Sequence, residues 1–387
     1  MTVVVLDDDP TGTQCAAGVE VLLRPAAVGP LPPGSACVYV LTNTRALTRD
    51  AAFALVAGLR ERIGPGHHLV LRGDSTLRGH VFAEMGALGL RRGVGLIVPA
   101  YPAAGRVTVG GVHYLTAGGA AVNVADTEFA RDPVFGFTAR TMTDWVHELG
   151  GRRPVTLVRR GGPLRAALLE TPDGGVVIPD VECAADHAPI VAGLAAARAA
   201  GRHVVVRCAA PLAARIGGVP GRLVRPSARA GRLLVVCGSH TAAATAQLDD
   251  LGLPRLELPT DGAGAPAPAI VAQALQRLAT TGIAVVTTER RRRAEHGSLA
   301  DGAAVMAGLM AVTRAVAPAI DAVISKGGIT SAEVATTGLG GAVATVHGQL
   351  ETGIPLWEVG GVPLAVVPGN IGDAGTLARM VGYFSAR

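Results

Sequence analysis

Three adjacent carboxylates, Asp7, Asp8 and Asp9, follow the first apolar segment of the chain. That segment, residues 3–6, predicts a buried strand, and the Pro and Gly residues after the acidic run predict a loop. Neighbouring carboxylates raise one another's pKa, so such a run needs a cation, a substrate hydroxyl or solvent beside it. The carboxyl ends of strands form the ligand-binding edge of an open α/β sheet. We therefore predict an active-site loop; the alternative is a solvated acidic turn that caps a helix near Thr11.

Two further predicted strands, residues 38–41 and 69–71, also run into polar loops. Arginine side chains match carboxylates through two parallel hydrogen bonds, while hydroxyl, amide and carboxylate groups suit a ligand with several hydroxyls. These loops therefore predict a binding site for a small hydroxy acid. A helix N-cap at Asp74 or Ser75, with two exposed arginines, is the alternative. The polar residues are Asn43 and Arg45 on the first loop, and Arg72, Asp74, Ser75, Thr76 and Arg78 on the second.

Three loops in the second half of the chain have the composition of phosphate-binding loops. Residues 238–239, 326–331 and 368–373 each follow an apolar segment, are rich in small residues and precede a predicted helix. Glycine lets the backbone approach a phosphate closely, and the N–H groups that open a helix favour an anion. Lys326, the only lysine among 35 basic residues, begins the second loop. Neither G-x-x-x-x-G-K-[ST] nor G-x-G-x-x-G is present. We predict nucleotide phosphate binding, with simple helix caps as the alternative for each loop.

The order of elements predicts the architecture. Strand, polar loop and helix alternate along both halves of the chain, which is typical of mostly parallel sheets with crossover helices. The Gly-, Pro- and Arg-rich residues 220–232 lack periodicity and predict a linker. We therefore expect an α/β fold of two domains, residues 1–225 and 230–387, with mostly parallel sheets and a cleft between them. Within the first domain, residues 106–114 predict a hairpin that turns at Gly110 and Gly111.

Composition argues against several classes of function. Aromatic residues make up 3% of the chain, too few for a base-stacking nucleic-acid platform. The net charge of +5 is spread out, and we expect the one dense basic run, residues 290–293, to form a solvated loop between two glutamates. Five cysteines without a C-x-x-C pair fit a reducing cytoplasm. No stretch of about 18 uncharged apolar residues predicts a membrane span.

Other catalytic and metal-binding patterns are missing. The sequence has no H-E-x-x-H or comparable metal spacing, so we expect no metal ion held by protein side chains alone, and it has no G-x-S-x-G nucleophile motif. We expect four histidines outside the loops described above to be surface or structural residues: His67, His68, His187 and His203.

Taken in order, these motifs resemble those of the four-carbon acid sugar kinases, which phosphorylate acids such as threonate, erythronate and 3-oxo-tetronate with ATP. The resemblance covers nearly the whole chain. It rests on residues 8–12 (DDPTG), 41–45 (LTNTR), 74–79 (DSTLRG), 99–102 (PAYP) with 105–106, 127–133, 238–239, 326–331 (KGGITS) and 368–373 (PGNIGD).

The resemblance implies an N-terminal domain that binds the sugar acid and a C-terminal domain that binds ATP, with Mg²⁺ carried on the phosphates. It makes a homodimer plausible, and it implies no nucleic-acid or membrane partner. Joined with the loops above, it gives Asp8 and Asp9 as catalytic candidates. The substrate-binding candidates are Asn43, Arg45, Asp74, Ser75 and Arg78, and the nucleotide-binding candidates are Ser239, Lys326, Gly327, Gly328, Ile329, Thr330, Gly369 and Asn370.

The expected reaction is transfer of the γ-phosphate to a hydroxyl of the acid, with Asp8 or Asp9 accepting the proton and Arg78 holding the substrate carboxylate. Two other classes of function stay open at this point. One is an NAD-dependent oxidoreductase of hydroxy acids, and the other is a sugar-acid-binding protein without catalysis.

Overall fold

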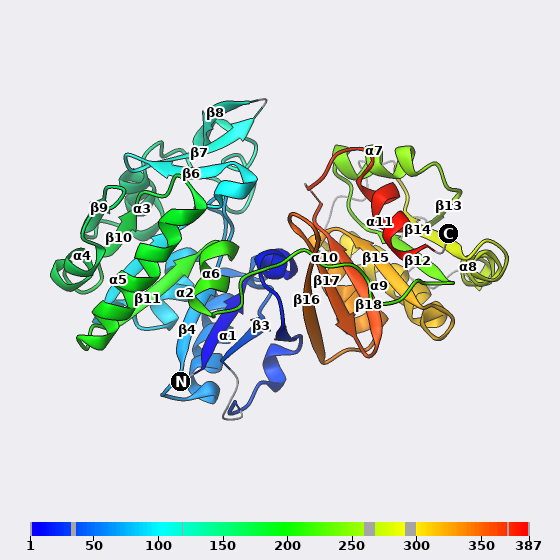
Figure 1. Cartoon of the computed structure of the whole chain (residues 1–387), viewed down its shortest axis with the longest axis horizontal. Helices are drawn as coiled ribbons and strands as arrows, with labels where there is room; N and C mark the ends of the chain where they lie inside the picture. The colour runs from blue at the N-terminus through cyan, green and yellow to red at the C-terminus, as the bar shows by residue number, and fades with distance from the viewer. Residues whose placement is uncertain are drawn as a thin grey trace. The chain divides into compact units, whose positions relative to one another are not determined.

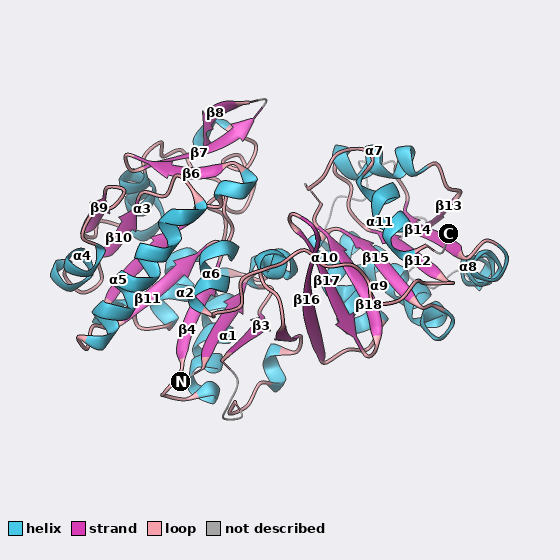
Figure 2. Ribbon diagram, in the orientation of Figure 1, coloured by secondary structure: helices cyan, strands magenta, loops and turns pink. Residues whose placement is uncertain are grey.

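The computed structural model describes residues 2–31, 36–117, 119–258, 268–290, 299–369 and 371–385. The chain forms two compact units. Unit 1 comprises Met1–Ala16 and Arg24–Pro220, and unit 2 comprises Ala17–Leu23 and Gly221–Arg387. Each unit is an α/β structure with a sheet that is wholly or mostly parallel (Figures 1 and 2). The predicted fold class is therefore confirmed for both units.

Unit 1 contains a sheet of parallel strands in the order β3-β1-β4-β11-β5-β10-β9. Most of these strands are runs of valine, leucine and isoleucine, and β3, β5 and β11 are buried along their whole length. Complete burial requires cover on both faces of the sheet. The strands are β1 (Val3–Asp7), β3 (Cys37–Leu41), β4 (His68–Arg72), β5 (Val94–Val98), β9 (Val155–Val158), β10 (Val176–Pro179) and β11 (Val204–Cys208).

Two groups of helices provide the cover in unit 1. Helix α1 packs on α2, and α2 on α3; on the other side α4 packs on α5, and α5 on α6. Figure 1 shows α5 and α6 in front of the sheet. Helix α1 begins where the Thr48 side chain accepts a hydrogen bond from Ala51 N, and it ends at Gly64. The helices are α1 (Arg49–Ile63), α2 (Val81–Ala87), α3 (Met142–Gly150), α4 (Leu164–Glu170), α5 (His187–Ala199) and α6 (Ala210–Ile216).

A small antiparallel sheet projects from unit 1 after β5. It consists of β6 (Arg106–Val109), β7 (Val112–Ala117) and β8 (Ala120–Asn123) in that order. The predicted hairpin is confirmed: Gly110 and Gly111 form its turn with φ of 62° and 75°, values that favour glycine. Figure 1 shows this three-stranded sheet beside the main sheet of unit 1.

The sheet of unit 2 has the order β13-β14-β12-β15-β18-β17-β16-β2. The first five strands are parallel, and then β17, β16 and β2 each run antiparallel to the strand before them in this order. Its core contains the fully buried Val235, Ile324 and Val367. The strands are β2 (Val19–Leu22), β12 (Leu233–Cys237), β13 (Arg255–Leu258), β14 (Ile283–Thr288), β15 (Ala322–Lys326), β16 (Val343–Glu351), β17 (Ile354–Val359) and β18 (Val362–Val367).

Strand β2 corrects the predicted domain boundary. The predicted first domain includes residues 17–23, but β2 pairs with β16, so these residues belong to unit 2. The partner strand lies more than 300 residues along the chain, from Val343 to Val346 opposite Val19 to Leu22. Local pattern carries no signal for a pairing between segments so far apart.

The helices of unit 2 also form two groups: α7 packs on α11, while α8, α9 and α10 pack together. They are α7 (Ala242–Leu251), α8 (Pro268–Thr280), α9 (Leu299–Val316), α10 (Gly328–Glu333) and α11 (Thr376–Phe384). Residues 302–319, which include most of α9, pass a test of length and composition for crossing a membrane, with mean hydropathy 1.4 and 33% of the window buried. Core helices pass the same test, and α9 contacts β13, β14 and α8 and buries Leu309 and Val312.

Candidate functional site

The acidic loop after β1 lies at the carboxyl edge of the unit 1 sheet, where β3, β1, β4 and β11 end side by side. Asp7 and Asp8 are only 1% and 2% exposed, which rules out a wholly solvated turn. The guanidinium of Arg72, at the end of β4, lies between them: Nη1 is 3.1 Å from Asp7 Oδ1 and 3.2 Å from Asp8 Oδ1. The prediction that these loops come together is therefore confirmed.

Two members of this cluster were missed by the sequence analysis. Arg207, near the end of β11, places Nη2 3.2 Å from Asp8 Oδ2 and pairs through Nη1 with Glu84 of α2. Glu84 also accepts a hydrogen bond from the Thr44 hydroxyl. The one available signal was a charged residue in the otherwise apolar segment 204–208, since a charge in a buried strand needs a buried partner.

Asp9 has a different environment from its two neighbours. Its Oδ2 is 2.6 Å from Arg45 Nη2, and its Oδ1 accepts hydrogen bonds from the backbone N–H and the hydroxyl of Thr11. Asp9 thereby caps the short 3-10 helix Pro10–Cys15, so the predicted cap near Thr11 is present as well. The side chain of Asp9 is 16% exposed, so solvent reaches it more easily than Asp8.

The second polar loop forms an ion pair beside the first. Asp74 Oδ2 is 2.7 Å from Arg78 Nε and accepts a hydrogen bond from the Thr76 hydroxyl. Arg78 also lies 5.0 Å from the ring centroid of Phe129. The expected alternative, a helix N-cap at Asp74 or Ser75, is wrong, because α2 begins after His80 and has no side-chain cap.

Ser75 and Asn43 contribute to the site through the backbone. The carbonyl of Ser75 is 2.9 Å from Nε2 of the buried His113 on β7, whose Nδ1 is 3.0 Å from the Thr108 hydroxyl. Burial lowers the pKa of His113 to about 4, so the ring is neutral and its Nε2–H can donate to Ser75. Asn43 adopts a left-handed conformation with φ of 49°, which turns the chain after β3 toward Arg45.

The electrostatics differ among the three adjacent carboxylates. Burial, reinforced by the charges of Asp8 and Asp9 and opposed by Arg72, raises the pKa of Asp7 to about 7. Burial also acts to raise the pKa of Asp9, but the guanidiniums of Arg45 and Arg72 and the hydrogen bonds from Thr11 hold it below its usual value. Asp9 therefore stays ionised where Asp7 takes up a proton.

In unit 2, the three predicted loops follow β12, β15 and β18, which are neighbours in the sheet. The Thr241 hydroxyl of the first loop donates to the Gly369 carbonyl of the third at 2.9 Å. Gly327 has φ of 116°, and a Cβ there would lie 3.0 Å from the Thr330 hydroxyl. A Cβ at Gly369 would lie 3.1 Å from the Ser239 hydroxyl. The loops therefore converge on a backbone cradle that side chains would fill, as a site for phosphate groups requires.

Lys326 is fully buried at the end of β15. Its Nζ donates hydrogen bonds to the carbonyls of Pro368 at 2.7 Å and Ile371 at 3.1 Å, which join the second loop to the third. Burial lowers its pKa to about 8, so it still carries its charge at neutral pH. Lys326 therefore supports the loops of the cradle. A side chain that binds a phosphate directly would be open to the ligand, whereas the Lys326 side chain is buried.

The remaining nucleotide-binding candidates are Gly328, Ile329, Thr330 and Asn370. Gly328 and Thr330 lie in the first turns of α10, and Ile329 beside them is 54% exposed. Asn370 lies outside the described residues. Arg290, expected in a solvated loop, instead donates to the Ser239 carbonyl at 2.7 Å and so supports the first loop; residues 291–293 lie outside the described part of the chain.

The three loops of unit 2 fit a bound nucleotide. The side chains of the described residues also show whether the protein could hold a metal ion by itself. Within the described ranges, no group of three or more His, Cys, Asp or Glu side chains has the placement of a metal site. The neighbouring acids Asp7, Asp8 and Asp9 are instead neutralised by arginines.

Comparison with known proteins defines the class to which this fold and these sites belong. Residues 3–216 match the family model described as "Sugar-binding N-terminal domain", and residues 234–377 match the model described as "Nucleotide-binding C-terminal domain". This chain therefore combines a domain of the sugar-binding model with a domain of the nucleotide-binding model. The first model covers more than half of this chain, so the chain belongs to the Sugar-binding N-terminal domain family.

Two solved structures share the fold. A Salmonella typhimurium LT2 protein, provisionally described as a tRNA synthase, has 18% identity and a TM-score of 0.75, with 99% of this chain and 100% of that chain covered. A Haemophilus influenzae protein of the DUF1537 family has 15% identity and a TM-score of 0.68, with 98% and 100% covered. No curated protein matches the sequence.

Proposed function

We propose that this protein is an ATP-dependent kinase that phosphorylates a hydroxyl of a small, four-carbon sugar acid. The observation that carries the proposal is the pairing of two kinds of site in one chain: carboxylates and arginines at the carboxyl edge of unit 1, and the glycine cradle of unit 2. Arginines suit the carboxylate of an acid, and a backbone cradle suits phosphates. The motif order that resembles the four-carbon acid sugar kinases supports the same substrate class.

In unit 1, Asp9 is the proposed base. Its carboxylate is ionised and partly exposed, and Arg45 and Thr11 fix its position. A carboxylate with a lowered pKa suits phosphoryl transfer, because the hydroxyl needs orientation more than early deprotonation. Asp8 is the anchor that holds Arg72 and Arg207 in place.

Arg78 is the proposed partner of the substrate carboxylate. Asp74 holds its Nε, and its contact with the Phe129 ring fixes the plane of the guanidinium. Its Nη1 lies 3.5 Å from Asp132, a long contact that an incoming carboxylate could replace. If Arg78→Ala leaves the KM for the acid unchanged, this role is wrong.

In unit 2, the loops of Ser239, Gly327 and Gly369 are proposed to hold ATP, which would supply the phosphoryl group together with its Mg²⁺. The chain's own part is to fix the phosphates with backbone N–H groups and to keep the three loops in register through Lys326 and Thr241. We place the protein in the cytoplasm, where ATP is available.

The direct test is ADP release by the purified protein with ATP and Mg²⁺ across a panel of acids. The panel contains both threonates, both erythronates and the 3-oxo acid, with a control that lacks any acid. ADP release that depends on one acid supports the proposal and names the substrate. Silence with ATP still bound points to a different acceptor or to a protein that binds without catalysis. Silence without ATP binding overturns the assignment of unit 2.

A further inference from the structure

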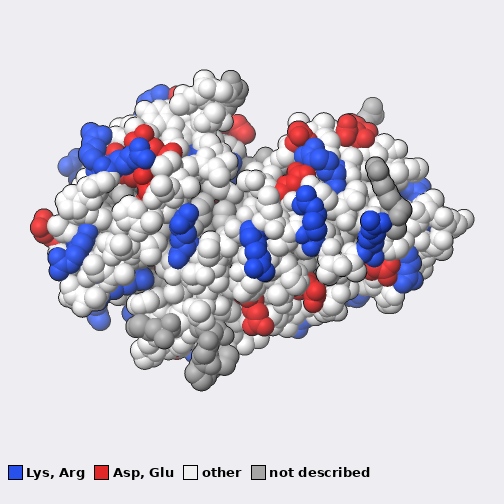
Figure 3. Space-filling model, in the orientation of Figure 1, with Lys and Arg blue, Asp and Glu red and all other residues white. Residues whose placement is uncertain are grey.

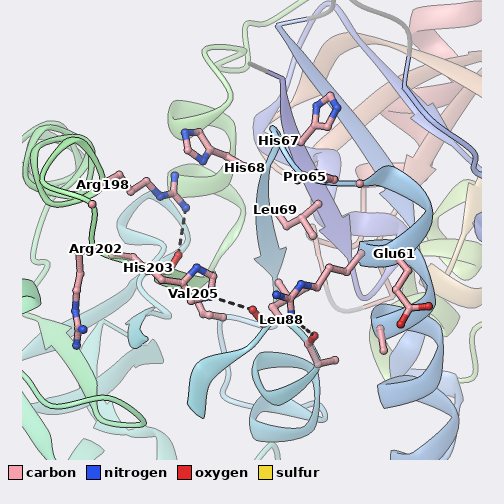
Figure 4. Close-up of a pocket in the computed structure, with 16 residues that line it drawn as sticks. Glu61, Pro65, His67, His68, Leu69, Leu88, Arg198, Arg202, His203 and Val205 are labelled. Carbon is pink, nitrogen blue, oxygen red and sulfur yellow. Dashed lines mark hydrogen bonds between the residues drawn. The ribbon is translucent and has the colours of Figure 1, made fainter. Parts of the chain in front are cut away.

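Unit 1 has a pocket at the edge of its sheet opposite the carboxylate cluster. Its volume is about 730 Å³, within the roughly 300–1,000 Å³ of small-molecule sites. The end of α1, the start of β4, the end of α2 and the segment from α5 into β11 form its walls (Figure 4). Strands β4 and β11 begin at this pocket and run toward Arg72 and Arg207, so the pocket and the candidate site occupy opposite ends of the same strands.

The pocket is strongly basic. Three arginines and three histidines line it, against a single acidic residue: Arg60, Arg198, Arg202, His67, His68, His203 and Glu61. One of the arginines, Arg202, already has an ion-pair partner and hydrogen-bond acceptors within the protein. Arg202 pairs with Asp173 at 2.6 Å and donates to the carbonyls of Leu168 and Thr171.

Arg198 has no such partner. It lies near the end of α5 and is partly buried, and its guanidinium donates a long hydrogen bond of 3.4 Å to the Val204 carbonyl, drawn as a dashed line in Figure 4. Among the described residues no carboxylate lies within ion-pair distance of its guanidinium. Burial lowers the pKa of Arg198 to about 10, which reflects a charge that lacks a counter-ion. A partly buried charge without a partner is unfavourable, and a bound anion would offset that cost.

Two histidines, His67 and His68, line the pocket together with Arg198. Nδ1 of His67 is buried and has no hydrogen-bond partner in the described part of the chain. The pKa of His68 is lowered, first by burial and second by the positive charge of Arg198, so the two side chains lie close together. An anion bound to Arg198 would therefore also lie within the electrostatic reach of His68.

We propose that this pocket binds a small organic anion, carrying a phosphate or carboxylate group, whose oxygens pair with Arg198. A guanidinium matches both groups through two parallel hydrogen bonds. Arg60 on α1, exposed except for a 3.1 Å hydrogen bond to the Ala87 carbonyl, supplies a second cation at the rim. The inference does not depend on the kinase proposal, because it concerns the other edge of the sheet.

The test is an NMR titration of the ring signals of the histidines in the full-length protein, with inorganic phosphate and, separately, with succinate. A His68→Gln variant assigns the His68 signal. We expect that signal to shift saturably with at least one of the two probes, and Arg198→Gln to weaken the affinity at least 10-fold. Arg165→Gln is the matched control, since it removes an exposed arginine of α4 outside the pocket. His240, next to Ser239, reports separately on phosphate bound at the unit 2 loops.

Each outcome decides the proposal. A response to phosphate alone, to succinate alone or to both supports the site and tells which group it prefers. The absence of a saturable His68 shift with either probe overturns it, as does wild-type affinity in a folded Arg198→Gln protein. If Arg198→Gln does not fold, Arg60→Gln decides instead: weaker affinity supports the site, and unchanged affinity contradicts it.

Discussion

Asp8 and Asp9 are neighbours in the chain, but their side chains differ in ion pairing and in exposure to solvent. Asp8 is surrounded by Arg72, Arg207 and Arg45 and is almost wholly buried. Breaking such buried pairs by removal of one member costs about 3–5 kcal/mol, because the arginines lose their counter-charge. Asp9 keeps one arginine and access to solvent. These surroundings support the proposal that Asp8 stabilises the fold and that Asp9 acts as the base.

We expect Asp9→Asn to lower kcat about 10²- to 10⁴-fold, the usual range for a removed acid–base group, with KM for ATP nearly unchanged. Asp8→Asn should lower the melting temperature instead. Steady-state kinetics and thermal denaturation of both variants check this, with Asp50→Asn, an exposed residue in the first turn of α1, as the control. Wild-type turnover in Asp9→Asn would remove Asp9 from the mechanism.

Asp7 gives a prediction about pH. Its pKa is raised from 3.8 to about 7, so between those values the folded protein holds a proton that the unfolded chain has lost. The contribution of Asp7 to the free energy of unfolding therefore falls as the pH rises between about 4 and 7. Asp7→Asn keeps the acceptor for Arg72 but cannot titrate, so the melting temperature of the variant minus that of the wild type should increase across this interval. A difference that is constant with pH would show that Asp7 titrates normally.

At the scale of elements, the cradle of unit 2 depends on how three loops are tied together. Lys326 ties the loops after β15 and β18, and Thr241 ties the loops after β12 and β18. A hydrogen bond from a charged group contributes about 1.5–3 kcal/mol, and 1.4 kcal/mol corresponds to a tenfold change in affinity. A single side chain can therefore set the affinity of the cradle without touching a ligand.

We predict that Lys326→Met raises the KM for ATP at least about 10-fold and leaves the KM for the acid unchanged. Because the chain has one lysine, ¹⁵N-lysine labelling gives a single side-chain Nζ signal in the wild type, and its titration should have a midpoint of about 8. A midpoint near 10.5 would mean an exposed ammonium. An unchanged KM for ATP in a folded variant would contradict the positioning role.

The sequence predicts the strands and loops that form the two sites, but it does not predict the hydrogen bonds and ion pairs that join them. Apolar segments rich in valine locate β1, β12 and β15, and polar or glycine-rich residues after them locate the loops. The role of Arg207 was not predicted, because its partner Asp8 is 199 residues away and because no run of polar residues follows β11. The position of Lys326 was predictable, but its hydrogen bonds were not, since they depend on where β18 delivers Pro368.

In the whole molecule, the two candidate sites lie in different units. The arginine and acid cluster is confined to unit 1 and the glycine cradle to unit 2. On the face shown in Figure 3, basic side chains are spread over both units, and acidic side chains lie beside several of them. The two-domain plan follows from the linker composition, whereas the transfer of β2 to unit 2 depends on a strand pairing that only the folded structure reveals.

The proposed reaction transfers the γ-phosphate of ATP to a hydroxyl of a sugar acid. The most direct measurement is ³¹P NMR of a reaction mixture containing the protein, ATP, Mg²⁺ and the acid selected by ADP release. We expect a new phosphomonoester signal that grows as ATP is consumed, and we expect Asp9→Asn to slow its growth. Consumption of ATP to inorganic phosphate with the acid unchanged would contradict it, as would an unchanged ATP spectrum with every acid of the panel.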